Sequence, residues 1–313
     1  MDYIIETKSL YKRYHRHEVL KGVDIHIPKG SIYGLIGKNG AGKTTLMRII
    51  TGIQTPSSGE YSLFGVSCND SGISSVRKRV GAVIESPSYC PEMTAEQNLR
   101  QQCRYLGIPD MNGIGDILET VGLSGTRKKK VKNFSFGMRQ RLGIAMALTG
   151  SPDVIILDEP VNGLDPAGII DIREMILKLN RERDITFLIS SHILDELARI
   201  ATHYGFMDGG RIVEDISSEE ISRKCRRYYT FEMDNFDSAV RIAEEHGLDY
   251  KVGSGEIVVY GDFDLDMLLN RWRDAGCRII NISQTNESLE NYYLNLIGGS
   301  GEGGEANDQS HAC

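Results

Sequence analysis

The stretch GKNGAGKTT, residues 37–45, constrains the fold of this 313-residue chain more than any other feature. It fits the pattern G-x-x-x-x-G-K-[ST] and follows an apolar run, residues 31–36, that predicts a buried strand; helical periodicity follows at residues 44–51. Its glycines let backbone N–H groups turn toward phosphate oxygens, and the start of the helix adds a positive dipole end. The segment therefore predicts a strand, loop and helix that bind a nucleoside triphosphate.

Two residues of this phosphate loop have specific expected roles. Lys43 is placed to reach the β- and γ-phosphates, and the hydroxyl of Thr44 is placed to bind Mg²⁺. The residues that we expect to hold the nucleotide are Gly37, Lys38, Asn39, Gly40, Ala41, Gly42, Lys43, Thr44 and Thr45.

A second chemical signal is the run VIILDEP at residues 154–160. Its apolar part is too short for a helix and predicts a central parallel strand that ends on two adjacent carboxylates. Asp158 is placed to hold Mg²⁺, directly or through water, and Glu159 is placed to face the water that attacks the γ-phosphate. Adjacent acids at a strand end can also be ordinary loop residues, but the phosphate loop favours a hydrolytic site.

Three further motifs resemble those of the ATP-binding cassette (ABC) proteins. FSFGMRQ at residues 134–140 resembles the family's signature segment, usually Leu-Ser-Gly-Gly-Gln, and keeps Ser135 and Gly137 of it. NGLDP at residues 162–166 resembles the aspartate loop, and SSH at residues 190–192 resembles the switch histidine. The resemblance implies an ATPase with an α/β fold: a P-loop NTPase cassette with a RecA-like core, an antiparallel β subdomain and an α-helical subdomain.

The resemblance also implies how the site is completed. Cassettes of this family pair head to tail, so Ser135 and Gly137 are expected to bind, in trans, the ATP held by the phosphate loop of a second cassette. His192 is expected near the γ-phosphate, where it helps to orient the water, and Asp165 beside the nucleotide. A homodimer that binds ATP and Mg²⁺ is the implied assembly.

Two positions in the first hundred residues complete the expected site. Tyr14 lies where the family keeps an aromatic ring stacked on adenine; Tyr11 is a competing candidate, and core packing is the other alternative. Glu85 stands where most cassettes carry glutamine, and we expect it to face the γ-phosphate and Mg²⁺ as both a catalytic and a metal-binding residue. The alternative for Glu85 is a surface acid that leads into a loop.

The runs IESPSYCPEMTAEQNL, FSFGMRQRLGIAMAL and ESLENYYLNLIGG look most like the bacitracin and lantibiotic-immunity exporters. This resemblance implies a subunit that powers a separate membrane permease, which exports a peptide antibiotic. An alternative is a regulatory or sensing ABC ATPase whose ATP-dependent dimerisation controls a partner. Heptad insertions or tandem cassettes, which would favour action on DNA or ribosomes, are missing, and so is the NKxD element of a GTPase.

The periodicity of the chain divides it into two domains and a tail. We expect the cassette over residues 1–224, with a helical subdomain at about 88–150 that begins near a capping box. Residues 225–297 predict a small α+β domain, with strands at 228–231, 256–260 and 278–283 and helices at 236–245 and 264–275. Residues 298–313, polar and rich in glycine, predict a disordered tail.

Charge and hydropathy exclude some partners. A net charge of −7 argues against nucleic acid as a partner, and the basic run at residues 127–132 is typical of a solvated loop. The apolar run at residues 154–157 is far shorter than the roughly 20 residues that cross a bilayer. We therefore expect no membrane span, and the resemblance to transporter subunits implies a cytoplasmic protein that is peripheral on the inner face of the cell membrane.

Overall fold

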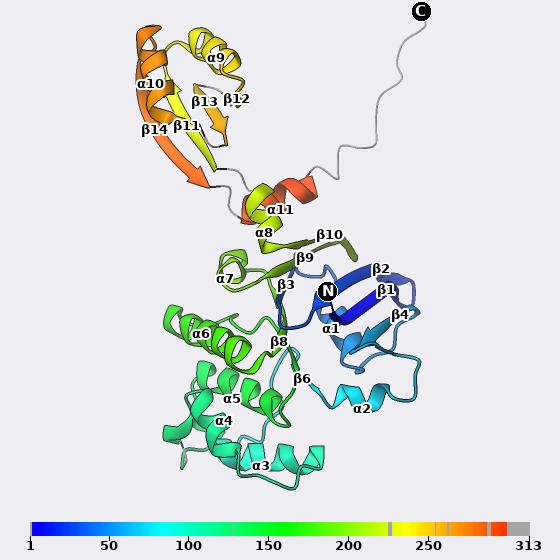
Figure 1. Ribbon diagram of the computed structural model, residues 1–313. Coiled ribbons are helices and arrows are strands. Elements are labelled where there is room, and N and C mark those ends of the chain that lie inside the picture. Colours follow the sequence, from blue (N-terminus) through cyan, green and yellow to red (C-terminus); the bar gives the residue numbers. More distant parts are fainter. Residues whose placement is uncertain are drawn as a thin grey trace, which may run out of the picture. The chain divides into compact units, whose positions relative to one another are not determined.

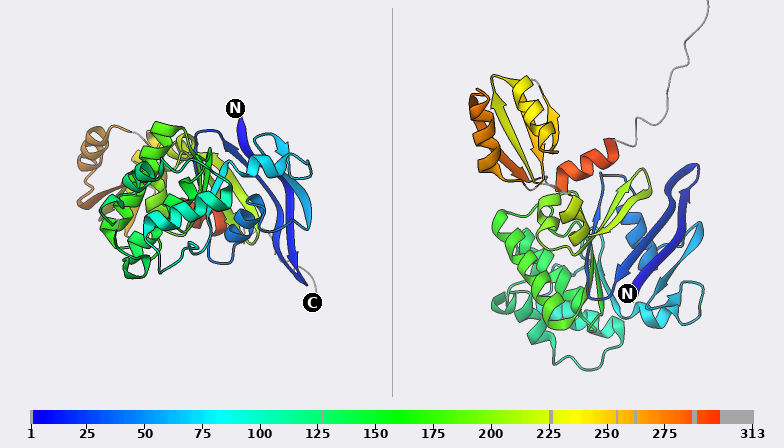
Figure 2. Two further views of the ribbon diagram at one scale, coloured as in Figure 1. Left: turned by 90° about the horizontal axis from the view of Figure 1, so that it is seen from below. Right: turned by 45° about the horizontal axis from the view of Figure 1, so that its top comes forward.

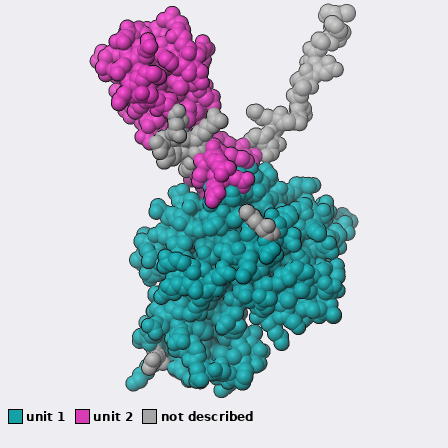
Figure 3. All heavy atoms as spheres, viewed as in Figure 1, with its two compact units in different colours: residues 1–218 teal, residues 219–313 magenta. Residues whose placement is uncertain are grey.

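The chain forms two compact units, residues 1–218 and 219–313 (Figure 3). The computed structural model describes residues 2–126, 128–224, 227–253, 255–261, 263–286 and 289–298. The division falls at the start of helix α8, Ser218–Lys224, whereas the sequence placed the domain boundary at its end. Beyond residue 298, the predicted tail lies outside the described residues.

The first sheet of unit 1 is antiparallel and has the order β2-β1-β4-β5. Its strands are β1 (Tyr3–Tyr14), β2 (His17–Pro28), β4 (Ser58–Leu63) and β5 (Val66–Ser67). The strands predicted at residues 3–7 and 23–27 are confirmed, and both are longer than predicted. Strand β1 continues past Thr7 because a register shift lets it pair again with both neighbours.

The second sheet has the order β10-β9-β3-β8-β7-β6 and is parallel except for β10. Strands β3, β7 and β8 are buried along their whole length, as expected for strands covered on both faces. Because these three strands run parallel, their carboxyl ends meet at one edge of the sheet. The strands are β3 (Ile32–Ile36), β6 (Val80–Val83), β7 (Val154–Asp158), β8 (Thr186–Ser191), β9 (His203–Asp208) and β10 (Arg211–Ser217).

Helix α1 (Lys43–Ile50) lies between the two sheets, whereas α6 (Pro166–Arg183) lies on the other side of the parallel sheet (Figures 1 and 2). Leu46 and Met47 of α1 are fully buried in one core with Ile25 of β2 and Ile156 of β7. This packing fixes the start of α1 directly beyond β3. Two short helices, α2 (Ile73–Arg77) and α7 (Leu194–Ala198), complete this part of the unit.

The predicted helical segment is present and packs closely on β6. It contains α3 (Ala95–Leu106), α4 (Ile114–Thr120), α5 (Phe136–Leu148) and 3₁₀ turns at Ser124–Thr126 and Val131–Asn133. The predicted capping box forms, with Thr94 and Gln97 exchanging hydrogen bonds at the start of α3. A Cβ at Gly81 would lie 2.1 Å from the Ala147 carbonyl oxygen, so α5 approaches β6 only because Gly81 has no side chain.

Unit 2 is a two-layer α+β domain, as the sequence predicted. After α8, its strands are β11 (Arg227–Met233), β12 (Asp249–Val252), β13 (Glu256–Tyr260) and β14 (Ile279–Asn286), in the antiparallel order β12-β13-β11-β14. Its further helices are α9 (Phe236–Glu245), α10 (Leu265–Asp274) and α11 (Leu289–Gly298). From β11 to β14 the element order and strand order are those of a ferredoxin-like fold.

Trp272 of α10 is the largest buried side chain of unit 2. Its ring meets Phe231 edge-on at 4.7 Å between centroids, and its Nε1 donates to the Ala239 carbonyl at 3.2 Å. One aromatic side chain thus joins both helices to the sheet. Within the described part of the chain, no helix is both long and apolar enough to span a membrane.

Candidate active site

The phosphate loop joins β3 to α1 in the conformation that its sequence predicts. Gly40 and Gly42 have φ of 83° and 112°, which favour glycine. A Cβ at Gly37 would lie 2.5 Å from the Met207 carbonyl oxygen, so β9 leaves no room for a side chain there. The loop is therefore held closely against the end of the parallel sheet.

Lys43 is buried at the start of α1, with only 6% of its side chain exposed. Its ammonium donates to the carbonyls of Gly37 at 2.6 Å and Lys38 at 3.3 Å, and it lies 3.6 Å from Glu159 Oε1. The amine is thus positioned within the loop, between backbone carbonyls and one carboxylate. Phosphate oxygens are the acceptors that such an amine meets in a loop of this kind.

Asp158 ends β7 and is 5% exposed. Its Oδ2 accepts a hydrogen bond from Thr44 Oγ1 at 2.8 Å, and its Oδ1 accepts one from Ser190 Oγ at 2.5 Å. The structure thus brings together two of the three residues that the sequence proposed for Mg²⁺, Thr44 and Asp158. A hydroxyl and a carboxylate are hard oxygen donors of the kind that Mg²⁺ prefers, so these side chains fit that ion.

Glu159 begins the loop after β7 with a left-handed φ of 50°. Its N–H donates to Ser190 Oγ at 3.0 Å and to the Ser190 carbonyl at 3.2 Å. Its Oε2 lies 2.7 Å from His192 Nδ1, which follows β8. A carboxylate only accepts, so this contact requires the hydrogen on Nδ1. The pair predicted to position water is in direct contact.

Ser135 and Gly137 stand at the start of α5, away from β3 and α1. Ser135 is the N-cap, and its Oγ accepts from the Met138 N–H at 3.3 Å. The helix therefore begins at Phe136. Asp165 of the aspartate loop caps α6 in the same way, accepting from the Gly168 N–H at 3.1 Å. The roles of these residues toward nucleotide stay predictions.

Tyr14 ends β1, and 38% of the residue is exposed. Its hydroxyl donates to Gln54 Oε1, and the Lys12 ammonium lies 5.1 Å from the ring centroid. Tyr11 is half-buried and covers Gly22, where a Cβ would lie 2.9 Å from the Tyr11 hydroxyl. Tyr14 is thus the more accessible of the two rings. Adenine stacking stays a prediction.

Glu85 differs from its expected placement. Its side chain is 63% exposed, and Oε1 accepts from Arg48 Nη2 of α1 at 2.5 Å. The carboxylate therefore faces a guanidinium and not the Thr44–Asp158 pair, because Arg48 supplies the opposite charge close at hand. A role at Mg²⁺ would need this ion pair to open, and it stays a prediction.

Sequence reasoning missed Ser190 and Arg48. The sequence motif SSH was assigned only to His192, yet Ser190 bonds to Asp158 and to Glu159. The signal lay in the apolar run TFLIS at residues 186–190, because parallel pairing of that strand with β7 sets Ser190 opposite Asp158. Arg48 belongs to no recognised motif, and only its position in the second turn of α1 pointed to a place near the phosphate loop.

A P-loop ATPase fold with the acid pair, the signature segment and the switch histidine defines an ABC cassette. Residues 20–162 match the family described as "ABC transporter". Over 305 residues the chain is 39% identical to the bacitracin transport ATP-binding protein BcrA of Enterococcus faecalis, covering 96% of this chain and 98% of that protein. The chain belongs to the ABC transporter ATP-binding proteins, a family of ATPases.

Other similar proteins are also ABC transporter components. The lantibiotic transport ATP-binding protein SrtF of Streptococcus pyogenes is 40% identical over 210 residues, which cover 67% of this chain and 89% of that protein. Among solved structures, cbiO1 of Clostridium perfringens, part of an ABC transporter complex, aligns with a TM-score of 0.64 and 27% identity over 71% of this chain and 91% of that one. The likeness to cbiO1 therefore covers less of this chain than the likeness to BcrA, which extends over both units.

Proposed function

We propose that this chain is the ATP-hydrolysing subunit of an exporter that removes a peptide antibiotic, of the bacitracin or lantibiotic class, from the cell membrane. The observation that carries the proposal is the 39% identity to a bacitracin transport subunit over 96% of the chain, including unit 2. The export class comes from that likeness. The chemistry comes from the residues of the site.

The chain's own residues support a hydrolytic mechanism. Lys43 exchanges backbone carbonyls for phosphate oxygens when ATP enters the loop. Glu159 accepts a hydrogen bond from the attacking water and polarises it, while His192 fixes the direction of the carboxylate. Thr44 and Asp158 would hold Mg²⁺, which would neutralise charge on the phosphates. A second copy of the chain closes the site with its Ser135 and Gly137.

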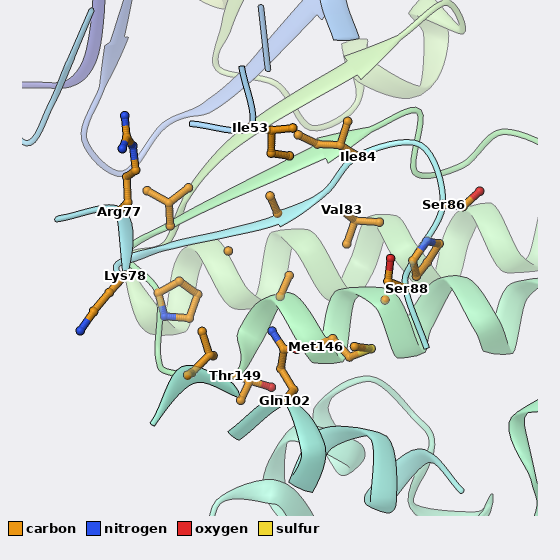
Figure 4. Close-up of a pocket in the computed structure, with 18 residues that line it drawn as sticks. Ile53, Arg77, Lys78, Val83, Ile84, Ser86, Ser88, Gln102, Met146 and Thr149 are labelled. Carbon is orange, nitrogen blue, oxygen red and sulfur yellow. The ribbon is translucent and has the colours of Figure 1, made fainter. Parts of the chain in front are cut away.

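The groove between β6, α3 and α5 supports a permease partner. It has a volume of about 320 Å³, with apolar Ile53, Val83 and Met146 along it and Arg77 and Lys78 at one end (Figure 4). The loop that follows Glu85 forms one wall. An amphipathic segment with an acidic end fits these walls in charge and polarity, so we propose that a permease loop docks here on the cytoplasmic face of the membrane.

The loop wall of this groove is tied to α5. A Cβ at Gly143 would lie 2.5 Å from Pro87 Cγ, so the loop and the signature helix touch without an intervening side chain. Movement of the helical segment during ATP binding is therefore passed directly to the groove. This contact gives the proposed coupling a physical route.

Glu159→Gln tests the chemistry and the transport role together. The amide keeps the shape but is a much poorer base, so ATP still binds, turnover falls by at least about a hundredfold, and an ATP-bound dimer accumulates. In cells that express the permease partner, wild type raises resistance to bacitracin or a lantibiotic, and Glu159→Gln does not. Glu174→Gln, on the exposed face of α6, is the matched control.

Two results would contradict the proposal in different ways. Near wild-type turnover by Glu159→Gln would remove this residue as the base. Normal ATPase activity of the wild type, with no membrane partner in pull-downs and no gain in resistance, would favour a regulatory ATPase over a transporter subunit.

A further inference from the structure

Phe136 has no role in the proposed mechanism, although it lies inside the signature segment. It is the first residue of α5 and follows the N-cap Ser135 directly. The residue is 47% exposed. It stands where the signature's usual form has glycine.

The ring of Phe136 packs on the aspartate loop of the same chain. A Cβ at Gly163 would lie 3.5 Å from Phe136 Cε1 and 3.7 Å from Cζ, so the ring covers the open side of this glycine. At the next residue of each segment, a Cβ at Gly137 would lie 3.4 Å from Leu164 Cδ2. The first turn of α5 therefore contacts two successive residues of the loop.

The aspartate loop is in turn tied to Glu159. The Asn162 N–H donates to the Glu159 carbonyl at 3.2 Å, and the Leu164 N–H donates to the Val161 carbonyl at 3.3 Å. These bonds make residues 159–164 one compact turn. Glu159 has a left-handed backbone, a conformation that persists only when its surroundings hold it. A shift of the loop is therefore passed to the base.

We propose that Phe136 is a positioning residue. Its ring holds the aspartate loop, and through that loop it sets the position of Glu159 in its own cassette. The second cassette covers the exposed part of the ring when the ATP-bound dimer closes. Closure therefore fixes the aspartate loop at the stage when Glu159 activates the water. The inference rests on the proposed function, because it takes the head-to-tail dimer as given.

Steady-state ATPase kinetics of Phe136→Ala, Phe136→Leu and a control test the proposal. Loss of an aromatic contact predicts a kcat about three- to tenfold lower in Phe136→Ala, with KM for ATP within about twofold of wild type. Phe136→Leu keeps an apolar side chain over Gly163 and should recover most of kcat. The control Leu177→Ala shortens an exposed side chain in the middle of α6 and should leave kcat unchanged.

Dimerisation separates a positioning role from a simple dimer contact. In the Glu159→Gln background, Phe136→Ala should still form the ATP-bound dimer, measured by size-exclusion chromatography with light scattering. An unchanged kcat in Phe136→Ala would overturn the proposal, and so would loss of the dimer at every ATP concentration tested. If Phe136→Ala does not fold, as judged by circular dichroism, Phe136→Leu is compared with wild type alone. A Phe136→Leu variant with wild-type KM and a kcat well below that of wild type would then also overturn the proposal.

Failure of the head-to-tail dimer, which is the part of the proposed function that this inference uses, would look different. Glu159→Gln with Phe136 intact would then stay monomeric in ATP. The kcat comparison between the Phe136 variants and Leu177→Ala would still decide whether the ring positions the base.

Discussion

Replacing Ser190 by alanine should destabilise the acid pair. Ser190 is fully buried; its Oγ donates to Asp158 Oδ1 at 2.5 Å and accepts from the Glu159 N–H at 3.0 Å. Alanine removes both bonds and leaves a buried carboxylate oxygen without this donor. A hydrogen bond to a charged group contributes about 1.5–3 kcal/mol. The Glu159 N–H keeps the Ser190 carbonyl, so we expect unfolding free energy to fall by about 2 kcal/mol.

The assay is urea unfolding followed by far-UV circular dichroism. Fluorescence of the single tryptophan, Trp272, would instead report on unit 2. Ser191→Ala is the matched control, because Ser191 is equally buried but its hydroxyl bonds only to backbone groups of Ile193. A loss of stability in Ser190→Ala no larger than in Ser191→Ala would refute the reasoning. ATPase activity should also fall in Ser190→Ala, because Asp158 loses a fixed partner.

Three further substitutions test other parts of the fold. Tyr33→Phe removes the donor to Asp215 Oδ1 and should lower the free energy of unfolding by about 1–3 kcal/mol at neutral pH. Burial raises the pKa of Tyr33, so the wild type loses stability as pH rises above about 10. Urea unfolding at neutral pH and above pH ~10 should therefore show a smaller loss of stability in the variant than in the wild type. Trp272→Ala should destabilise unit 2 by about 3–5 kcal/mol, measured by limited proteolysis of that unit; an unchanged cleavage rate would contradict its core role. Gly143→Ala forces Pro87 away and should cost about 1–3 kcal/mol in thermal unfolding, whereas an unshifted Tm would mean that the loop moves freely.

The sequence predicted correctly those elements whose apolar periodicity lies within their own residues. The strand over residues 256–260 and the helix over residues 236–245 have the predicted bounds, because their apolar periodicity ends at turn residues. Strand β6, by contrast, has four residues, and one of them is Gly81, a residue that weakens strand propensity. Its place in the sheet is set by pairing with β7 and by close contact with α5. Such non-local contacts leave no periodic signal in the sequence.

The same distinction between local and non-local signals applies to the candidate active site. Lys43, Thr44, Asp158 and Glu159 were predicted because their chemistry needs fixed spacing along the chain. Ser190 was not, because its role depends on which residue of β7 it pairs with, and that register exists only in the folded sheet. Residues that react are thus visible in the motif, whereas residues that hold them depend on tertiary pairing.

The two carboxylates that the sequence proposed for Mg²⁺, Asp158 and Glu85, differ in burial. Asp158 is 5% exposed and held by two side-chain donors, so moving it breaks charge-assisted bonds in a dry environment. Glu85 is paired with Arg48 at the surface, where such an ion pair contributes only about 0–1 kcal/mol. The Glu85 carboxylate can therefore leave Arg48 at little cost. If Glu85 joins the site when the cassettes close, it is the acid that has to change partners, whereas Asp158 keeps its bonds to Thr44 and Ser190.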